Sequence, residues 1–157
     1  MIFTMQHFEK KKDQFFISTD QCLLDLKKTH QMIAESYWAK GISQCLFEKS
    51  VKNSLCFGLY KDNMQLGFAR VVSDYATFAY LGDIFIVSDY RGHGLSKWLM
   101  EVVMLHPELQ GLRRFCLGTK DAHGLYEKYG FKSIDNSRNW MEIKIADIYL
   151  RGNDSNY

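Results

Sequence analysis

The stretch IFIVSDYRGHGLSKWLMEVVM, residues 84–104, decides the fold of this 157-residue chain. An apolar run suited to a buried strand leads into a turn with two glycines. A segment follows whose apolar residues recur at helical spacing, and the sole proline, Pro107, is expected to end that helix. The order strand, glycine turn, helix brings unpaired main-chain N–H groups and the positive end of a helix dipole together, an arrangement that binds anions.

The turn itself indicates which kind of anion site this is. Gly92 and Gly94 let the main chain approach a phosphate closely because no Cβ intervenes, and Arg91 and Lys97 add positive charge. The spacing excludes both a Walker loop (GxxxxGK[ST]) and a Rossmann loop (GxGxxG). A glycine turn before a helix can also be purely structural, so this segment alone leaves the ligand open.

The pattern on either side predicts an α+β fold. An antiparallel meander precedes a strand–helix–strand unit and further strands, so helices should cover a twisted sheet. Thr119 or Asp121 is expected to cap the last helix. Strands are predicted at 15–17, 55–60, 65–73, 78–87, 112–117, 131–134 and 140–145, and helices at 21–36, 43–53, 95–106 and 122–129.

Length and composition predict one domain over residues 1–150, with a polar tail at 151–157. The 46% hydrophobic and 24% charged residues are typical of a soluble globular protein. A net charge of +2 argues against a nucleic-acid partner, and the basic run Lys10–Lys12 is interpreted as a solvated turn. No apolar run of membrane-spanning length and no signal peptide is seen, so we expect no membrane association and a cytoplasmic location.

The four cysteines, at 22, 45, 56 and 116, are scattered without metal-ligand spacing. We interpret them as buried free thiols in a reducing compartment.

Two motifs resemble those of the GNAT N-acetyltransferases. Residues 91–96, RGHGLS, resemble the R/Q-x-x-G-x-G/A motif of that family. Residues 122–131, AHGLYEKYGF, resemble its A-x-x-L-Y-x-x-x-G-F segment. The order and interval of the motifs are also typical, and the strong match runs from about Phe78 to Phe131. The resemblance implies a GNAT-like fold: a twisted, mostly antiparallel sheet of six to seven strands with a central, splayed parallel pair, flanked by about four helices.

The resemblance also implies acetyl-CoA as co-substrate and no metal. The main chain of Ile84, Phe85 and Ile86 would pair with the pantetheine arm, and the amides of residues 92–97 would hold the pyrophosphate. The implied cofactor-binding residues are Ile84, Phe85, Ile86, Arg91, Gly92, His93, Gly94, Leu95, Ser96, Lys97, Thr119 and Tyr126. Two of them depart from the family pattern: Ser96 replaces the usual Gly or Ala, and Thr119 stands where many members have an Asn.

Acyl transfer to an amine suggests two catalytic candidates. Asp83 lies in an apolar strand, close to where some family members carry a catalytic Glu, and is a candidate base that would need a water relay. It could equally be a solvent-facing residue at a strand end. Tyr126 is the candidate general acid for the departing thiolate, as the family often uses this tyrosine; alternatively it packs on the sheet. Aromatic residues are available to line an acceptor pocket: Tyr37, Trp38, Tyr75, Phe78 and Trp140.

The resulting hypothesis is an N-acetyltransferase that moves an acetyl group from acetyl-CoA to a primary amine by direct attack in a ternary complex. A small-molecule acceptor is favoured, because no acidic stripe that would attract basic peptides is visible. The alternatives are a protein lysine or N-terminal acetyltransferase, and an acyl-CoA-binding module of the same fold without significant turnover. Dimers are common in the family, so a homodimer is compatible with the resemblance, but nothing in the sequence locates an interface.

Overall fold

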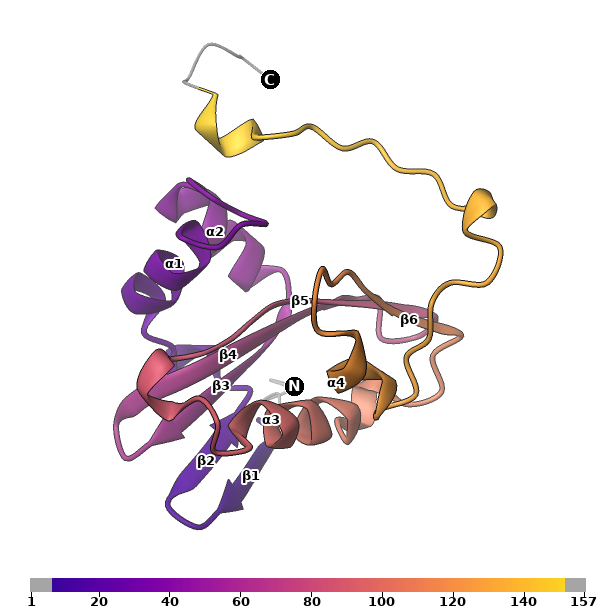
Figure 1. Cartoon of the computed structure of the whole chain (residues 1–157). Helices are drawn as coiled ribbons and strands as arrows, with labels where there is room; N and C mark the ends of the chain where they lie inside the picture. Colours follow the sequence, from indigo (N-terminus) through magenta and orange to yellow (C-terminus); the bar gives the residue numbers. More distant parts are fainter. Residues whose placement is uncertain (1–6, 152–157) are drawn as a thin grey trace, which may run out of the picture.

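Six strands form one continuous sheet in the computed structural model, which describes residues 7–151 (Figure 1). The strands lie in sequence order, antiparallel from β1 to β5 and parallel between β5 and β6. The α+β class and the GNAT-like sheet are therefore confirmed. The strands are β1 (Glu9–Lys12), β2 (Phe15–Ser18), β3 (Leu55–Lys61), β4 (Met64–Ser73), β5 (Phe78–Ile86) and β6 (Arg114–Leu117).

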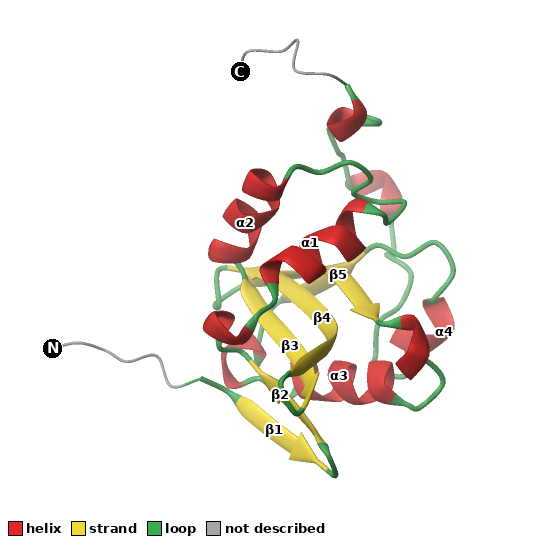
Figure 2. Ribbon diagram, turned by 90° about the vertical axis from the view of Figure 1, so that its left-hand side faces the viewer, coloured by secondary structure: helices red, strands yellow, loops and turns green. Residues whose placement is uncertain are grey.

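Helices cover both faces of this sheet. Figures 1 and 2 show α1 and α2 on one face, and α3 and α4 on the other. The α-helices are α1 (Leu26–Ala34), α2 (Gln44–Lys52), α3 (Leu95–Met104) and α4 (His123–Glu127). Short 3₁₀ turns occupy Gln21–Leu23, Ser88–Tyr90, Pro107–Leu109, Ser137–Asn139 and Ile148–Leu150. No helix within residues 7–151 has the length and apolar character needed to cross a membrane.

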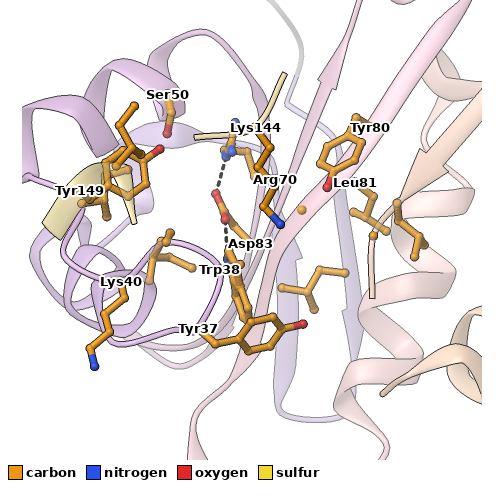
Figure 3. Close-up of a pocket in the computed structure, with 18 of the residues that line it drawn as sticks. Tyr37, Trp38, Lys40, Ser50, Arg70, Tyr80, Leu81, Asp83, Lys144 and Tyr149 are labelled. Carbon is orange, nitrogen blue, oxygen red and sulfur yellow. Dashed lines mark hydrogen bonds and ion pairs between the residues drawn. The ribbon is translucent and has the colours of Figure 1, made fainter. Parts of the chain in front are cut away.

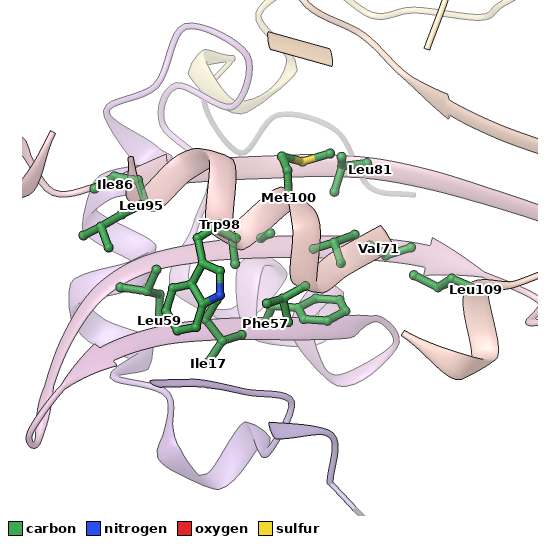
Figure 4. Close-up of a cluster of buried hydrophobic side chains, with 14 of the residues drawn as sticks. Ile17, Phe57, Leu59, Val71, Leu81, Ile86, Leu95, Trp98, Met100 and Leu109 are labelled. Atoms are coloured by element: carbon green, nitrogen blue, oxygen red, sulfur yellow. The ribbon is translucent and has the colours of Figure 1, made fainter. Parts of the chain in front are cut away.

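Helix α3 supplies the larger of two apolar clusters. Its predicted apolar face is buried, with Leu99 and Val103 fully inaccessible, and it packs on side chains such as Phe57 and Leu59 of β3 (Figure 4). Burying an aliphatic side chain of this size contributes about 1.5–3 kcal/mol. The helix that opens at the glycine turn is thereby fixed to the sheet, and so is the turn itself.

The helix predicted at 21–36 forms as two elements, each capped by an aspartate. Asp20 caps the 3₁₀ turn by accepting a hydrogen bond from the Cys22 amide (2.9 Å). Asp25 then caps α1 by accepting from the Lys28 amide (2.9 Å). The second cap restarts the chain as a new helix, so one amphipathic pattern yields two elements.

The basic run Lys10–Lys12 forms part of a strand, so its interpretation as a solvated turn is wrong. Lys10–Lys12 belong to β1, which pairs with β2 and forms one edge of the sheet. Lysines have low strand propensity, and the sequence therefore indicates no strand here. On an edge strand they are common, because charge discourages pairing with another chain.

The two strands predicted at 131–134 and 140–145 are also wrong. The chain beyond Gly130 leaves the sheet, and from Lys132 to Arg151 it contains only two 3₁₀ turns (Figure 1). The parallel pair consequently lies at the end of the sheet order rather than at its centre. A strand needs a partner for its main chain, and this segment has none among residues 7–151.

All four cysteines are free. Cys22 and Cys45 are exposed, which contradicts their prediction as buried thiols, whereas Cys56 is buried and Cys116 is half-buried. Burial raises the pKa of the Cys116 thiol, so it stays protonated and weakly nucleophilic near neutral pH. Of the polar tail predicted at 151–157, the part beyond Arg151 lies outside the described residues.

A buried histidine follows α3, which ends at Met104. The His106 ring packs edge-on against Phe8 and Phe57, and its Nδ1 accepts a hydrogen bond from the Glu108 amide (3.2 Å). Burial lowers the pKa of His106 below its ordinary 6.5, although nearby Glu108 opposes the shift. The folded state therefore favours the neutral ring.

This burial predicts a loss of stability in mild acid. Below pH 6.5 the unfolded chain binds a proton at His106 that the folded chain does not, so the free energy of unfolding should fall, by at most about 1.4 kcal/mol per pH unit. Urea unfolding between pH 7.5 and 5 measures the slope. His106→Asn, which can still cap the turn but does not titrate there, should have a smaller slope. Equal slopes would contradict the assignment.

Candidate active site

Strand β5 changes its course at a β-bulge. Between the pairs Phe68↔Phe85 and Arg70↔Gly82, one β4 residue faces two β5 residues, Asp83 and Ile84. Asp83 takes the left-handed conformation there, with φ 54°. A bulge bends its strand and increases the local twist.

The bulge coincides with the separation of β5 from β6. Their parallel pairing ends at Leu81↔Leu117. Beyond that point Ile84, Phe85 and Ile86 no longer face β6, although β5 stays paired to β4 through Phe85 and Ile86. Main-chain groups of β5 are thus available on the side that β6 has left.

The glycine turn carries a row of main-chain N–H groups that no protein group within residues 7–151 accepts, from Gly92 to Lys97. Gly92 and Gly94 adopt φ values of 79° and 76°, which residues with a Cβ rarely adopt. Gly94 is the N-cap of α3 and offers no capping side chain, so the first turn of the helix stays open to an external acceptor.

Side chains around the turn hold it in place. Arg91 Nε donates to the Ile86 carbonyl (2.9 Å), which ties the turn to the end of β5. The His93 Nδ1 lies 3.0 Å from the Arg91 carbonyl. Leu95 is buried in the core, Ser96 is half-buried and Lys97 is exposed. Because these three side chains differ in burial and chemistry, their predicted contribution to an anion site rests on their main-chain amides.

Two cavities flank the separated strands. The smaller, about 440 Å³, lies over the glycine turn and the end of β5, and Arg91, Gly92 and Ser96 are among its walls. The larger, about 1160 Å³, lies between the α1–α2 region, β5, the segment 117–126 and residues 142–149 of the C-terminal segment. Three residues line both cavities: Trp38, Ile84 and Tyr126. The two spaces therefore meet where the strands part.

Asp83 projects into the larger cavity, where it is held by two donors (Figure 3). Its Oδ2 accepts from Arg70 Nε (2.6 Å) and its Oδ1 from Trp38 Nε1 (2.9 Å). The Asp83 side chain is 9% exposed and that of Arg70 is 19% exposed. The cationic Arg70 compensates this nearly buried carboxylate, so the cavity wall carries an ion pair rather than an isolated charge.

Tyr126 lies at the junction of the cavities, on α4. Burial, followed by the nearby Tyr37 and Asp121, raises the pKa of Tyr126 above its ordinary value of 10. The phenol therefore keeps its proton throughout the neutral range and is available as a donor.

The remaining predicted residues are divided between the cavity and other parts of the molecule. Thr119 lines the larger cavity, and its hydroxyl accepts from the Ala122 amide (3.0 Å). Ala122 is the N-cap of α4 and no side chain caps this helix, so the predicted cap by Thr119 or Asp121 is wrong. Of the five aromatic candidates, Tyr37 and Trp38 line this cavity. The other three, Tyr75, Phe78 and Trp140, do not.

Sequence reasoning missed Arg70. It is the only charged residue in the apolar run LGFARVV, residues 66–72, which was a signal that a partner should be sought. The partner, Asp83, lies 13 positions away and meets it only because β4 and β5 pair. Within residues 7–151 no cluster of three or more metal-ligating side chains occurs.

Comparison with known proteins agrees with this arrangement. Residues 52–133, just over half of the chain, match the family model of the acetyltransferase (GNAT) domain. The chain belongs to the GNAT family of acetyltransferases. The matched range contains the bulge, the glycine turn and α4, so the family assignment and the candidate site cover the same part of the fold.

Relatives of known structure or curated sequence support this GNAT assignment. A crystallised Xanthomonas campestris pv. campestris protein, assigned as an acetyltransferase of the GNAT family, is 48% identical, covers 88% of this chain and 99% of its own, and superposes with a TM-score of 0.86. A Gibberella zeae protein assigned as an acetyltransferase is 27% identical over 87% of this chain and 90% of its own length. A Clostridium acetobutylicum protein solved with acetyl-CoA is only 14% identical (TM-score 0.59, over 88% and 96% of the two chains) and shows the fold alone.

The ion pair in this GNAT domain generates a stability prediction. Arg70→Met would leave the Asp83 carboxylate nearly buried without its cation, and should lower the free energy of unfolding by about 1–3 kcal/mol. Urea unfolding measures this. The exposed Arg113 is the matched control, since Arg113→Met should stay within about 0.5 kcal/mol of the wild type. If both variants were equally stable, the pair would make no net contribution.

Proposed function

We propose that this GNAT protein transfers an acetyl group from acetyl-CoA to a primary amine of a small molecule, by direct attack within a ternary complex. The observation that carries the proposal is the meeting of two cavities at Tyr126: one lies over the glycine turn and the other contains a fixed carboxylate. A donor and an acceptor could thus approach one another from opposite sides.

The smaller cavity fits the donor. Acetyl-CoA supplies the thioester, and the open amides from Gly92 to Lys97 would bind its pyrophosphate, aided by the dipole of α3. The unpaired side of β5 at Ile84–Ile86 would bind the pantetheine arm through main-chain hydrogen bonds. The acetyl-CoA in the Clostridium acetobutylicum neighbour supports this use of the fold.

The larger cavity fits the acceptor. An amine with pKa near 10.4 is neutral in only on the order of one molecule in 10³ at pH 7, so a proton must be removed before attack. The Asp83 carboxylate would attract the ammonium form and take its proton through a bridging water, because both of its oxygens already accept a hydrogen bond. Tyr126 would then donate its proton to the departing thiolate.

Two features favour a small acceptor over a protein. The cavity of about 1160 Å³ is bordered by Tyr37 and Trp38, whose rings suit an organic ammonium ion. Its charged border is balanced, with four basic residues (Lys40, Lys49, Arg70 and Lys144) and four acidic ones (Asp83, Asp121, Glu142 and Asp147). This border has no excess of acidic residues that would attract a lysine-rich peptide.

The donor assignment predicts the effect of filling the glycine turn. Gly94→Val should weaken CoA binding by at least about tenfold, because a side chain at φ 76° distorts the turn and occupies the open space above its amides. Isothermal titration with CoA measures the affinity.

Gly111→Val is the matched control. Gly111 has φ 71° and open space around it, but it lies between the Pro107–Leu109 turn and β6, outside the glycine turn. The two variants should lose similar stability while only Gly94→Val loses CoA affinity. Equal affinities in the two variants would exclude the turn as the binding site.

The catalytic assignment predicts slow but still CoA-competent variants. Tyr126→Phe and Asp83→Asn should each lower kcat by about 10²-fold with CoA affinity retained, because each removes a proton-transfer group and not a CoA contact of the turn. Release of free thiol from acetyl-CoA, measured against a panel of small amines, reports the rate. Loss of activity through deprotonation of Tyr126 should appear only above pH 10.

The same measurement separates the alternatives. A binding module would take up CoA but release no thiol with any amine or peptide, and the two substitutions would then change nothing. A lysine or N-terminal acetyltransferase would be faster with peptides than with every small amine.

A further inference from the structure

The ion pair at the wall of the larger cavity leaves one nitrogen of Arg70 without a partner (Figure 3). Arg70 Nε donates to Asp83, and Nη1 donates to the Ser54 hydroxyl (3.0 Å). No protein group within residues 7–151 accepts from Nη2. This nitrogen is not enclosed either, because among the described residues the Tyr60 hydroxyl is the only fully buried polar side-chain atom without a partner. Arg70 Nη2 is therefore open to a ligand.

The Asp83 carboxylate also has acceptor positions to spare. An ionised carboxylate can accept about four hydrogen bonds, and Trp38 and Arg70 use two of these positions. The open Nη2 belongs to the same guanidinium as the Nε that lies 2.6 Å from Asp83 Oδ2. An open donor and an open acceptor thus lie side by side on one ion pair.

The charges of the cavity favour a ligand that carries both signs. Arg70 compensates Asp83, so a ligand that is only a cation meets no isolated negative charge. The four basic and four acidic residues of the border also sum to zero. A ligand with adjacent opposite charges, arranged in the reverse order, gains a favourable contact with each member of the ion pair. The site is therefore complementary to a zwitterion.

We infer that the acceptor is an α-amino acid, an inference which rests on the acetyl transfer proposed above and narrows its acceptor. The amino group binds beside Asp83, and the carboxylate accepts from Arg70 Nη2. An α-amino acid carries these two groups on one carbon, which matches the adjacent positions on the ion pair. Arg70 is then a specificity-determining residue, because it holds the part of the acceptor that does not react. The rings of Tyr37 and Trp38 remain available for the side chain of the amino acid.

The reaction with this acceptor yields an N-acetyl amino acid. The nitrogen forms a bond to the acetyl carbon of acetyl-CoA, and the C–S bond breaks with its electron pair passing to sulfur. The ammonium group loses two protons in all. One is released to water by way of Asp83, and the other replaces the proton that Tyr126 gives to sulfur, so CoA leaves as the thiol.

Matched ligands test the inference on the wild-type chain. Norleucine is compared with pentylamine, which lacks its carboxylate, and with ε-aminocaproate, an isomer whose carboxylate is at the far end of the chain. Phenylalanine and phenethylamine form an aromatic pair. Thiol release from acetyl-CoA gives kcat/KM for each, and the amino acid of at least one pair should exceed its amine by about 30-fold or more, the contribution of one hydrogen bond between charged groups. Pentylamine and ε-aminocaproate should be similarly slow.

The outcomes separate this inference from the proposed function. A smaller preference in both pairs, or ε-aminocaproate as fast as norleucine, overturns the amino-acid acceptor and leaves acetyl transfer to amines intact. No thiol release with any of the five ligands overturns both.

Arg70→Lys tests the role of the open nitrogen. A lysine keeps a cation for Asp83 but has no second nitrogen for the carboxylate of the acceptor, so the preference for the amino acid should fall by at least about tenfold. The ratio of two rates in one preparation depends neither on the folded fraction nor on the basicity of the two amines, which is the same for both enzymes. The control is Arg113→Lys, at an exposed arginine before β6, which should keep the wild-type ratio. An Arg70→Lys variant with the full preference overturns the assignment.

Discussion

The separation of β5 from β6 is the constraint on which the rest of the structure depends. β5 pairs with β6 only as far as Leu81. The bulge at Asp83 then bends β5 away from β6, while β5 remains paired with β4. A regular sheet would satisfy these main-chain groups internally and leave no room for a ligand. Because the same strand leads directly into the glycine turn and α3, the turn is placed at the end of the gap. The bend in β5 thus creates the opening between the strands and also places the open amides of the glycine turn beside it.

The bulge in turn relies on Asp83, the one charged residue of the strand β5. Asp83 holds a backbone conformation that an aspartate tolerates better than a β-branched residue does. Its carboxylate is compensated by Arg70 from the neighbouring strand and by Trp38 from the segment after α1. These contacts therefore join three parts of the chain at the cavity wall and place the carboxylate in it. A structural device and a candidate catalytic group are the same residue.

The local parts of this design could be predicted from the sequence because local residues determine them. The strand at 78–86, the glycine turn and the apolar face of α3 follow from periodicity and from two glycines. What could not be predicted depends on pairing between distant residues. Arg70 meets Asp83 only through strand register. β1 is a strand because its main chain pairs with that of β2, although its lysines have low strand propensity. Conversely, residues 140–145 have a strand pattern without a strand, because pattern describes the side chains and not the availability of a partner.

The two edges of the sheet are chemically unlike, and this limits how copies of the chain can associate. β1 ends the sheet with three consecutive lysines, so another β1 approaching it would be repelled. Within residues 7–151, the other edge of the sheet is β6, which carries no lysine. A protein with two receptive edges could polymerise without end into a fibre, whereas one with a single receptive edge stops growing once that edge is filled. The lysine-rich strand therefore disfavours pairing of the β1 edge with another strand.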